Sequence, residues 1–290
     1  MLAGVIAVAI AASIAGAALT RAARSPAPAS SCLRPNAPST ADSKPAAQAP
    51  DSGGIQVAEQ GFTQIKESKP LFSDRWVSIG AVLANTSAHV AYRTHVVVRM
   101  LDKEGRSALA ETAAPVANLD IPLIMPGQHI GLGSRLPVHE DDRGRLAKVA
   151  RVEVTLGSTH WLPSTGDQGL AQVAAHHVRT ERDSEYPTDS MTYYSIESTY
   201  CEKLFPRGVS VVFRDATGRV VGGSFDGASS LRCDPGANKG QVSTADVLPP
   251  NFDGPKTTVS VYCDLQPRDR TIYIQPTGQT VPLPSSEPFN

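Results

Sequence analysis

The chain contains one pattern twice, as VVVRMLDKEGR at residues 96–106 and as VSVVFRDATGR at residues 209–219. In a strand, alternate side chains share a face, so Val98 and Met100 in the first copy point to one side, which we expect to be a core. The other side then faces water or a partner. The Asp-x-x-Gly-Arg that follows predicts a hairpin turn, because the aspartate accepts backbone hydrogen bonds and the glycine adopts a positive φ.

Two further matches follow in the same order along the chain. IMPG at residues 124–127 matches CDPG at residues 233–236, and residues 150–156 match residues 257–263. The repeat is about 110 residues long, which is the size of a domain rather than of a solenoid unit. Short runs rich in Val, Thr, Ile and Tyr, separated by Gly, Pro and Asp, occupy the chain from Gly61 onward. They predict an all-β protein made of two tandem immunoglobulin-like antiparallel β-sandwiches.

The order of these segments resembles that of the FxLYD-type domain, an immunoglobulin-like sandwich of bacterial and archaeal extracytoplasmic proteins. VRMLD at residues 98–102 and VVFRD at residues 211–215 stand where the family has its signature, with the aspartate alone identical. The two Pro-Gly pairs stand at the corner of the family pattern. The resemblance covers roughly residues 60–165 and 175–280, and it implies an interaction or adhesion module without catalytic residues.

The N-terminal stretch LAGVIAVAIAASIAGAAL, residues 2–19, contains no charged residue. A helix over this stretch would span roughly 27 Å, which is just enough to cross the core of a bilayer. It predicts an apolar helix that is either a transmembrane anchor or a cleaved signal peptide, for which AGA at residues 15–17 is a cleavage site. A buried helix is the third alternative. Arg21 and Arg24 follow the stretch, and for an anchor the positive-inside rule would then leave the body in the cytoplasm. The three cysteines of the body favour instead the extracytoplasmic side of the cell membrane, or secretion.

Residues 25–54 are rich in Pro, Ala and Ser, which predicts a disordered linker. The expected organisation of the chain follows from this linker and the segments described above. It comprises a signal peptide or transmembrane anchor at residues 1–24, a disordered linker at 25–54, β-sandwich repeats at 55–165 and 171–280, and a flexible tail at 281–290.

The four cysteines are Cys32, Cys201, Cys233 and Cys263, and no C-x-x-C pair occurs among them. Their spacing excludes zinc ribbons and thioredoxin-type redox sites, so we expect a disulfide bond formed in an oxidising compartment. We expect a bridge between Cys201 and Cys263, whose spacing resembles the inter-sheet disulfide of immunoglobulin domains. A bridge between Cys201 and Cys233 is the alternative.

No sequence motif of a known catalytic, cofactor-binding or metal-binding site is present, and we expect no catalytic residue, cofactor or metal. The seven histidines are scattered, and the adjacent His176 and His177 would point to opposite sides of a strand. HEDD at residues 139–142 lacks the regular spacing of a calcium loop and predicts a solvated loop.

The net charge of −1 gives the chain no overall attraction to nucleic acid, so we expect no nucleic-acid partner. The sequence predicts a non-enzymatic envelope protein that is membrane-tethered or exported and binds an envelope or extracellular protein or another extracellular ligand. Contact with the membrane would be made through the N-terminal segment. The alternatives are an envelope hydrolase with an unrecognised site and a purely structural spacer.

Overall fold

The computed structural model describes residues 32–35, 54–65, 76–111, 117–162, 169–227, 231–244, 247–267, 273–274 and 280–281. Cys32–Asn290 form one compact unit, distinct from Met1–Ser31, and the fold below is that of the first of these. The predicted apolar helix lies outside the described residues, as do residues 25–31 and 36–53 of the predicted linker and residues 282–290 of the predicted tail.

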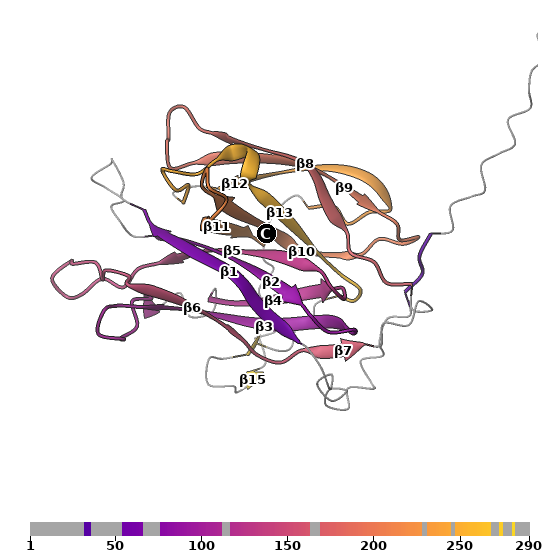
Figure 1. Ribbon diagram of the computed structural model, residues 1–290, viewed down its shortest axis with the longest axis horizontal. Coiled ribbons are helices and arrows are strands. Elements are labelled where there is room, and N and C mark those ends of the chain that lie inside the picture. Colours follow the sequence, from indigo (N-terminus) through magenta and orange to yellow (C-terminus); the bar gives the residue numbers. More distant parts are fainter. Residues whose placement is uncertain are drawn as a thin grey trace, which may run out of the picture. The chain divides into compact units, whose positions relative to one another are not determined.

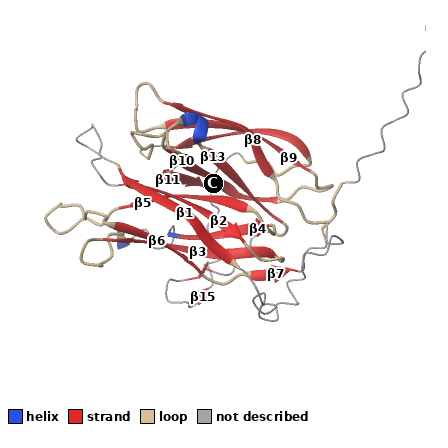
Figure 2. Ribbon diagram, in the orientation of Figure 1, coloured by secondary structure: helices blue, strands red, loops and turns tan. Residues whose placement is uncertain are grey.

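The described residues fold into antiparallel β-sheets, which confirms the predicted all-β class (Figure 2). Among them, helical structure is confined to short 3-10 turns such as η4 (Gly254–Lys256). No helix in the described part of the chain combines the length and the apolar character that a membrane span requires.

Each repeat contributes one set of strands (Figure 1). The first set is β1 (Ile55–Gln64), β2 (Trp76–Asn85), β3 (Val90–Leu101), β4 (Asn118–Ile124), β5 (His129–Pro137), β6 (Arg151–Leu156) and β7 (His160–Leu162). The second set is β8 (Ala174–Arg182), β9 (Ser190–Ser198), β10 (Phe205–Arg214), β11 (Val220–Asp226), β12 (Gly236–Thr244) and β13 (Thr258–Asp264). The short strands β14 (Tyr273–Ile274) and β15 (Thr280–Val281) pair with each other.

The two sets have the same strand order. The first forms the sheets β1-β2-β5 and β4-β3-β6, with β7 added to β3, and the second forms the sheets β8-β9-β12 and β11-β10-β13. The two copies of the repeated pattern lie on β3 and β10, which are the central strands of equivalent sheets. The internal similarity of the sequence thus corresponds to an equivalent topology in the structure.

Two apolar cores each join the two sheets of one repeat, and each also takes in residues of the other repeat, such as Tyr262 in the first and Tyr92 in the second. The first core unites β2 and β5 with β3 through residues such as Ile79, Leu132 and Met100. The second unites β9 with β10 and β13 through residues such as Ile196 and Phe213. This arrangement is the sheet-on-sheet packing of a β-sandwich, in which alternate residues of each strand enter the core.

Sheet β1-β2-β5 also packs against sheet β11-β10-β13 of the second repeat (Figure 1). Both sheets are therefore covered on two faces, and every residue of β2 after Trp76 is buried. Glycine and serine occupy several positions between the two repeats, beside an apolar cluster of Val82, Val212 and Val220. A Cβ atom at Gly80 would lie 2.2 Å from the carbonyl oxygen of Gly222, and one at Gly133 would lie 2.2 Å from that of Ser224. The backbones can approach this closely only because these positions have no side chain.

Hydroxyl groups satisfy the backbone of β5 at this interface. Strand β5 pairs with β2 alone, so the peptide groups along its other edge lack a strand partner. The hydroxyl of Ser210 accepts a hydrogen bond from the N–H of Gly133, and that of Ser260 accepts one from the N–H of Gly131 at 2.8 Å. The Tyr262 hydroxyl donates to the carbonyl oxygen of Gly131 at 2.8 Å.

Hydroxyl groups of the first repeat likewise satisfy backbone groups of strand β11 in the second repeat. It pairs with β10 alone, and the Ser78 hydroxyl both accepts from the Gly223 N–H at 2.9 Å and donates to the Gly223 carbonyl oxygen at 3.0 Å. The Thr63 hydroxyl donates to the carbonyl oxygen of Val221 at 2.7 Å. Each repeat thus supplies the hydroxyls that satisfy an edge strand of the other, which removes the penalty for burying unpaired peptide groups.

The predicted Asp-x-x-Gly-Arg turns are confirmed. Asp102 Oδ1 accepts from the N–H of Arg106 at 2.8 Å, and Gly105 has φ 82°. Asp215 makes the equivalent bond to Arg219 at 3.1 Å, and the Thr217 hydroxyl and the Arg219 guanidinium hold the pKa of Asp215 well below its usual range.

The predicted solvated loop at residues 139–142 contains a third turn of the same kind, DDRGR at residues 141–145. Asp141 Oδ1 accepts from the N–H of Arg145 at 2.9 Å and from that of Arg143 at 3.0 Å, and Gly144 has φ 73°. The acidic run is therefore explained by turn formation.

The close approach of the repeats predicts the effect of adding one methyl group. In Gly133→Ala, the new Cβ would meet two backbone oxygens, those of Ser224 at 2.2 Å and Val211 at 2.3 Å, so a sheet must shift. We expect the free energy of unfolding to fall by about 1–3 kcal/mol, measured by urea denaturation. The control is Gly54→Ala, where nothing lies within 4 Å of the added Cβ. Equal stability of the two variants would contradict close packing at this interface.

Candidate functional site

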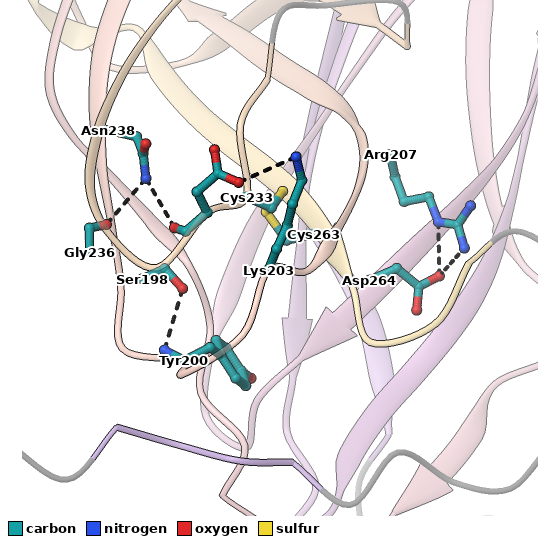
Figure 3. The surroundings of a disulfide bond; sticks show 10 residues. Ser198, Tyr200, Lys203, Arg207, Cys233, Gly236, Asn238, Cys263 and Asp264 are labelled. Atoms are coloured by element: carbon teal, nitrogen blue, oxygen red, sulfur yellow. Dashed lines mark hydrogen bonds and ion pairs between the residues drawn. A yellow bond between two sulfur atoms is a disulfide. The ribbon is translucent and has the colours of Figure 1, made fainter.

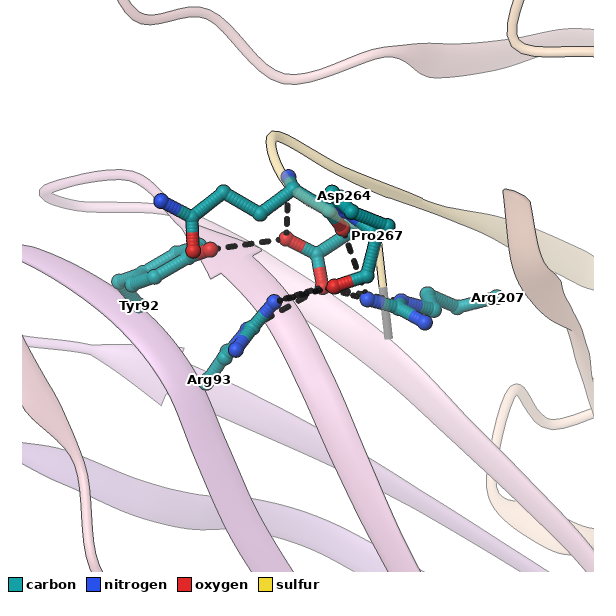
Figure 4. A network of polar contacts seen from close by, with 6 residues as sticks. Tyr92, Arg93, Arg207, Asp264 and Pro267 are labelled. Atoms are coloured by element: carbon teal, nitrogen blue, oxygen red, sulfur yellow. Dashed lines mark hydrogen bonds and ion pairs between the residues drawn. The ribbon is translucent and has the colours of Figure 1, made fainter. Parts of the chain in front are cut away.

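A polar cluster that links the two repeats surrounds Asp264, at the end of β13 (Figure 4). The carboxylate is buried, with 2% of the residue exposed. Its Oδ1 accepts from the Tyr92 hydroxyl at 2.9 Å, and its Oδ2 accepts from Nε of Arg93 at 3.2 Å and from Nε of Arg207 at 2.9 Å. Tyr92 and Arg93 belong to β3 of the first repeat, so one carboxylate joins the two repeats.

The Asp264 carboxylate accepts further hydrogen bonds. Besides the side chains, the N–H of Gln266 donates to Oδ1 at 3.2 Å, and a second nitrogen of Arg207 donates to Oδ2 at 2.6 Å. Burial, together with the negative charge of Asp264, raises the pKa of Tyr92, so its hydroxyl remains protonated and remains a donor. A general base needs a free lone pair that faces a substrate. The geometry around Asp264 is instead that of a structural link between the two repeats, which we call the Asp264 joint.

Arg93 adopts a backbone conformation that is unusual for a residue with a side chain. Its φ is 50°, in the left-handed region, although it lies within β3. It falls between two residues that pair with β4, opposite Pro122, which has no N–H for the ladder. Such a conformation costs about 1–3 kcal/mol and persists where the surroundings hold it. Here the guanidinium is held by Asp264 and by the carbonyl oxygen of Pro267 at 3.3 Å.

The predicted Cys201–Cys263 disulfide is wrong, and so is the alternative Cys201–Cys233. The structure pairs Cys233 with Cys263 and Cys32 with Cys201 (Figure 3 shows the first of these). Cys263 lies on β13, and the segment that carries Cys233 is held beside it, because the Cys233 carbonyl oxygen accepts from the N–H of Leu204 at 3.0 Å. Cys201 follows β9, and its N–H donates to the carbonyl oxygen of Leu33 at 2.9 Å, which brings Cys32 within reach.

All four cysteines take part in these two disulfides. Such pairing indicates an oxidising, extracytoplasmic environment, because thiols in the cytosol are kept reduced. The position of Cys32 also corrects one part of the predicted disordered linker at residues 25–54. Residues 32–35 lie on the second repeat, where Leu33 forms an isolated parallel bridge with Tyr200.

A groove with a volume of about 370 Å³ runs between the edges of β1 and β6. Each of these strands pairs on one side only within its sheet. The register of β1 shifts at Ala58, an irregularity that leaves this residue without a partner on β2. The lining residues are Val57, Ala58, Glu59, Gln60, Glu153 and Val154.

The histidines do not gather. Among the described residues, no group of three or more His, Cys, Asp or Glu side chains is placed to hold a metal ion. His176 and His177 lie on β8, where His177 has φ 51° and the register shifts. His95 forms a pair with Asp120, its Nδ1 lying 2.9 Å from Oδ1, and this hydrogen bond raises the pKa of His95.

The chain matches no known family model and no curated protein. The resemblance to FxLYD-type domains therefore stays a prediction that rests on the sequence. The residues of the Asp264 cluster were not singled out in the sequence, because Tyr92 and Asp264 are separated by 172 positions and neither carries a local motif.

The Asp264 joint predicts a large loss of stability when its charge is removed. In Asp264→Asn, two partly buried guanidinium groups lose their shared carboxylate, so we expect the free energy of unfolding to fall by about 2–3 kcal/mol. Chemical denaturation measures it. The control is Glu153→Gln, which breaks an exposed ion pair with Arg151 and should change stability by less than about 1 kcal/mol. A loss in Asp264→Asn no greater than in the control would contradict the assigned joint.

The His95–Asp120 pair predicts a pH-dependent contribution to stability. The pKa of His95 is raised in the folded state, so the contribution is complete below the unfolded-state pKa and is lost as the pH rises through the folded-state pKa. Asp120→Asn should therefore destabilise the protein more at pH 5.5 than at pH 8.5, by less than about 1 kcal/mol because Asp120 is largely exposed. The measurement is urea unfolding of both proteins at both pH values. An equal difference at the two pH values would show that the pair makes no charge-dependent contribution.

Proposed function

We propose that this protein is a non-enzymatic component of the bacterial envelope, tethered to the membrane or exported, whose two tandem immunoglobulin-like sandwiches bind another protein. The N-terminal apolar stretch and the two disulfides support a location on the extracytoplasmic side of the cell membrane or outside the cell. The tether would be the apolar stretch itself, if it is retained, and a secreted protein would result if it is cleaved.

The groove between β1 and β6 is the observation on which the proposed binding role rests. An edge strand presents peptide N–H and C=O groups that can pair with an extended segment of another chain. In this protein β5 and β11 are also edge strands, but hydroxyls of the other repeat satisfy them. The strands β4, β8, β12 and β13 also pair on one side only. The groove, however, lies at the edges of β1 and β6, and for this reason we place the partner there.

The character of the groove indicates the kind of partner. Val57, Ala58 and Val154 supply apolar or small surfaces, while Glu59 and Glu153 are each already paired with an arginine. Main-chain pairing would therefore provide the affinity, and a small side chain of the partner would fit beside Ala58. This mode needs no cofactor and no catalytic residue.

The polar clusters of the described residues support a role in binding rather than catalysis. The buried carboxylate of Asp264 is saturated by donors, and the aspartates of the three turns are occupied by backbone N–H groups. These acids thus have structural partners, so they favour binding over the hydrolase considered from the sequence.

The test is to block the groove with one long side chain. Ala58→Arg places a bulky cation between β1 and β6, and we expect it to abolish capture of the partner that the unmodified protein retains from envelope extracts. The control is Gln241→Arg, which adds the same side chain at an exposed position of β12. Captured proteins are identified by mass spectrometry, and binding is then measured with the purified partner.

Two results would contradict this proposal. One is that Ala58→Arg captures the same protein with unchanged affinity, which would remove the groove from the interface. The other is that the unmodified protein captures nothing above the level of the Ala58→Arg variant, which would favour a structural spacer. Far-ultraviolet circular dichroism of both variants establishes that the β-sheets are intact.

A further inference from the structure

The two disulfides differ in their access to solvent. Cys233 and Cys263 are buried, with 0% and 7% of each residue exposed, and they belong to the second core. Cys32 is exposed, and Cys201 is half-buried. Because an attacking thiolate must reach a sulfur atom, the Cys32–Cys201 bridge is open to exchange while the Cys233–Cys263 bridge is shielded by the protein.

The exposed bridge holds a short segment, residues 32–35, which we call the strap. Within the described part of the chain, the strap makes two backbone hydrogen bonds besides the disulfide, from the Leu33 N–H to the Thr199 carbonyl oxygen at 2.8 Å and from the Cys201 N–H to the Leu33 carbonyl oxygen at 2.9 Å. The backbone of Arg34 also lies beside Gly169. The Leu33 side chain packs against the second core.

These few contacts are weak beside the entropy that is lost when four residues are ordered. The covalent bond removes most of that cost, because it keeps the strap beside Tyr200. The strap is therefore stable on the second repeat only while the disulfide is closed.

We propose that Cys32–Cys201 is an exchangeable disulfide that a dithiol reductant opens, and that opening it releases the strap from the second repeat. A thiolate of the reductant attacks the exposed sulfur of Cys32, forming a mixed disulfide and expelling Cys201 as a thiolate, which takes up a proton. The second thiol of the reductant then attacks the mixed disulfide, and Cys32 leaves as a thiolate and is protonated in turn. Two electrons reduce the bridge, and the reductant ends as a disulfide.

Release of the strap changes one defined place on the surface. The carbonyl oxygen of Thr199 and the N–H of Cys201 lose their partner on the strap, and the part of the second core that Leu33 covers becomes accessible. This device lies on the second repeat and does not depend on the groove between β1 and β6. Its test is thus independent of the test of the proposed function.

The experiment uses the purified, oxidised full chain and dithiothreitol as the dithiol. Samples are treated with increasing concentrations, quenched with N-ethylmaleimide and mapped by mass spectrometry. We expect Cys32 and Cys201 to be labelled together, at least 10-fold faster than Cys233 and Cys263. At the stage where only the first pair is open, hydrogen exchange of the Leu33 and Cys201 amides should rise sharply.

Matched controls separate release of the strap from general unfolding. The amide of Val261 on β13 should exchange as slowly as before, since its strand pairing with β10 does not involve the strap. The double variant Cys32→Ser, Cys201→Ser should show rapid exchange at the amide of residue 33 without any reductant. The reduction of the unmodified chain remains decisive if this variant folds poorly.

Three results would overturn the proposal. Reduction of all four cysteines at one rate would show that burial does not protect the inner bridge. Earlier reduction of Cys233 and Cys263 would reverse the assignment. Unchanged exchange at the Leu33 and Cys201 amides after selective opening would show that the strap is held by its other contacts.

Discussion

The structure depends on the contact between sheet β1-β2-β5 and sheet β11-β10-β13, where two backbones approach closely at glycine positions beside the apolar cluster of Val82, Val212 and Val220. Two conditions must hold there together. The facing residues must be small, as Gly80 and Gly133 are, and the peptide groups of the edge strands need partners in a place that the other repeat covers. Serine meets both, because its side chain is short and its hydroxyl both donates and accepts. Each buried peptide group left without a partner would cost about 1–3 kcal/mol.

This contact makes the repeats mutually dependent. The hydroxyls of Ser210 and Ser260 belong to the second repeat but satisfy β5 of the first, while Ser78 does the reverse for β11. Asp264 adds a charged link by holding Tyr92 and Arg93 of the opposite repeat. Apolar burial contributes to the junction as well, because Val82 of the first repeat packs against Val212 and Val220 of the second. Each core also extends across it, since Tyr262 belongs to the first core and Tyr92 to the second.

The strands and turns were predictable because their causes are local. Alternation along residues 96–101 requires only that one face be buried, and the aspartate and glycine of each turn act within five residues. Residues 209–213 are buried on both faces, because β10 also packs against the first repeat. The third turn, at Asp141, has the same local signal, which the acidic residues around it obscured. The junction was not predictable, because Ser78 and Gly80 alternate with core residues just as solvent-facing positions do. Disulfide pairing failed for a related reason: it is fixed by which segments meet in space, and Leu33 brings Cys32 to Cys201 from 169 positions away.

The Cys32–Cys201 bridge also determines how the protein would carry a mechanical load. Tension applied at the two ends of the chain passes from Cys32 directly through the sulfur atoms to Cys201, so the 169-residue separation between them contributes nothing to the path. All the strands of the first repeat lie inside this covalent loop and would bear no force. In the second repeat the Cys233–Cys263 bridge removes a further separation of 30 residues from the extensible length. A molecule pulled between its ends would therefore carry the load through β10 and β11, which lie between Cys201 and Cys233, while its first sandwich, with the groove between β1 and β6, remained unloaded.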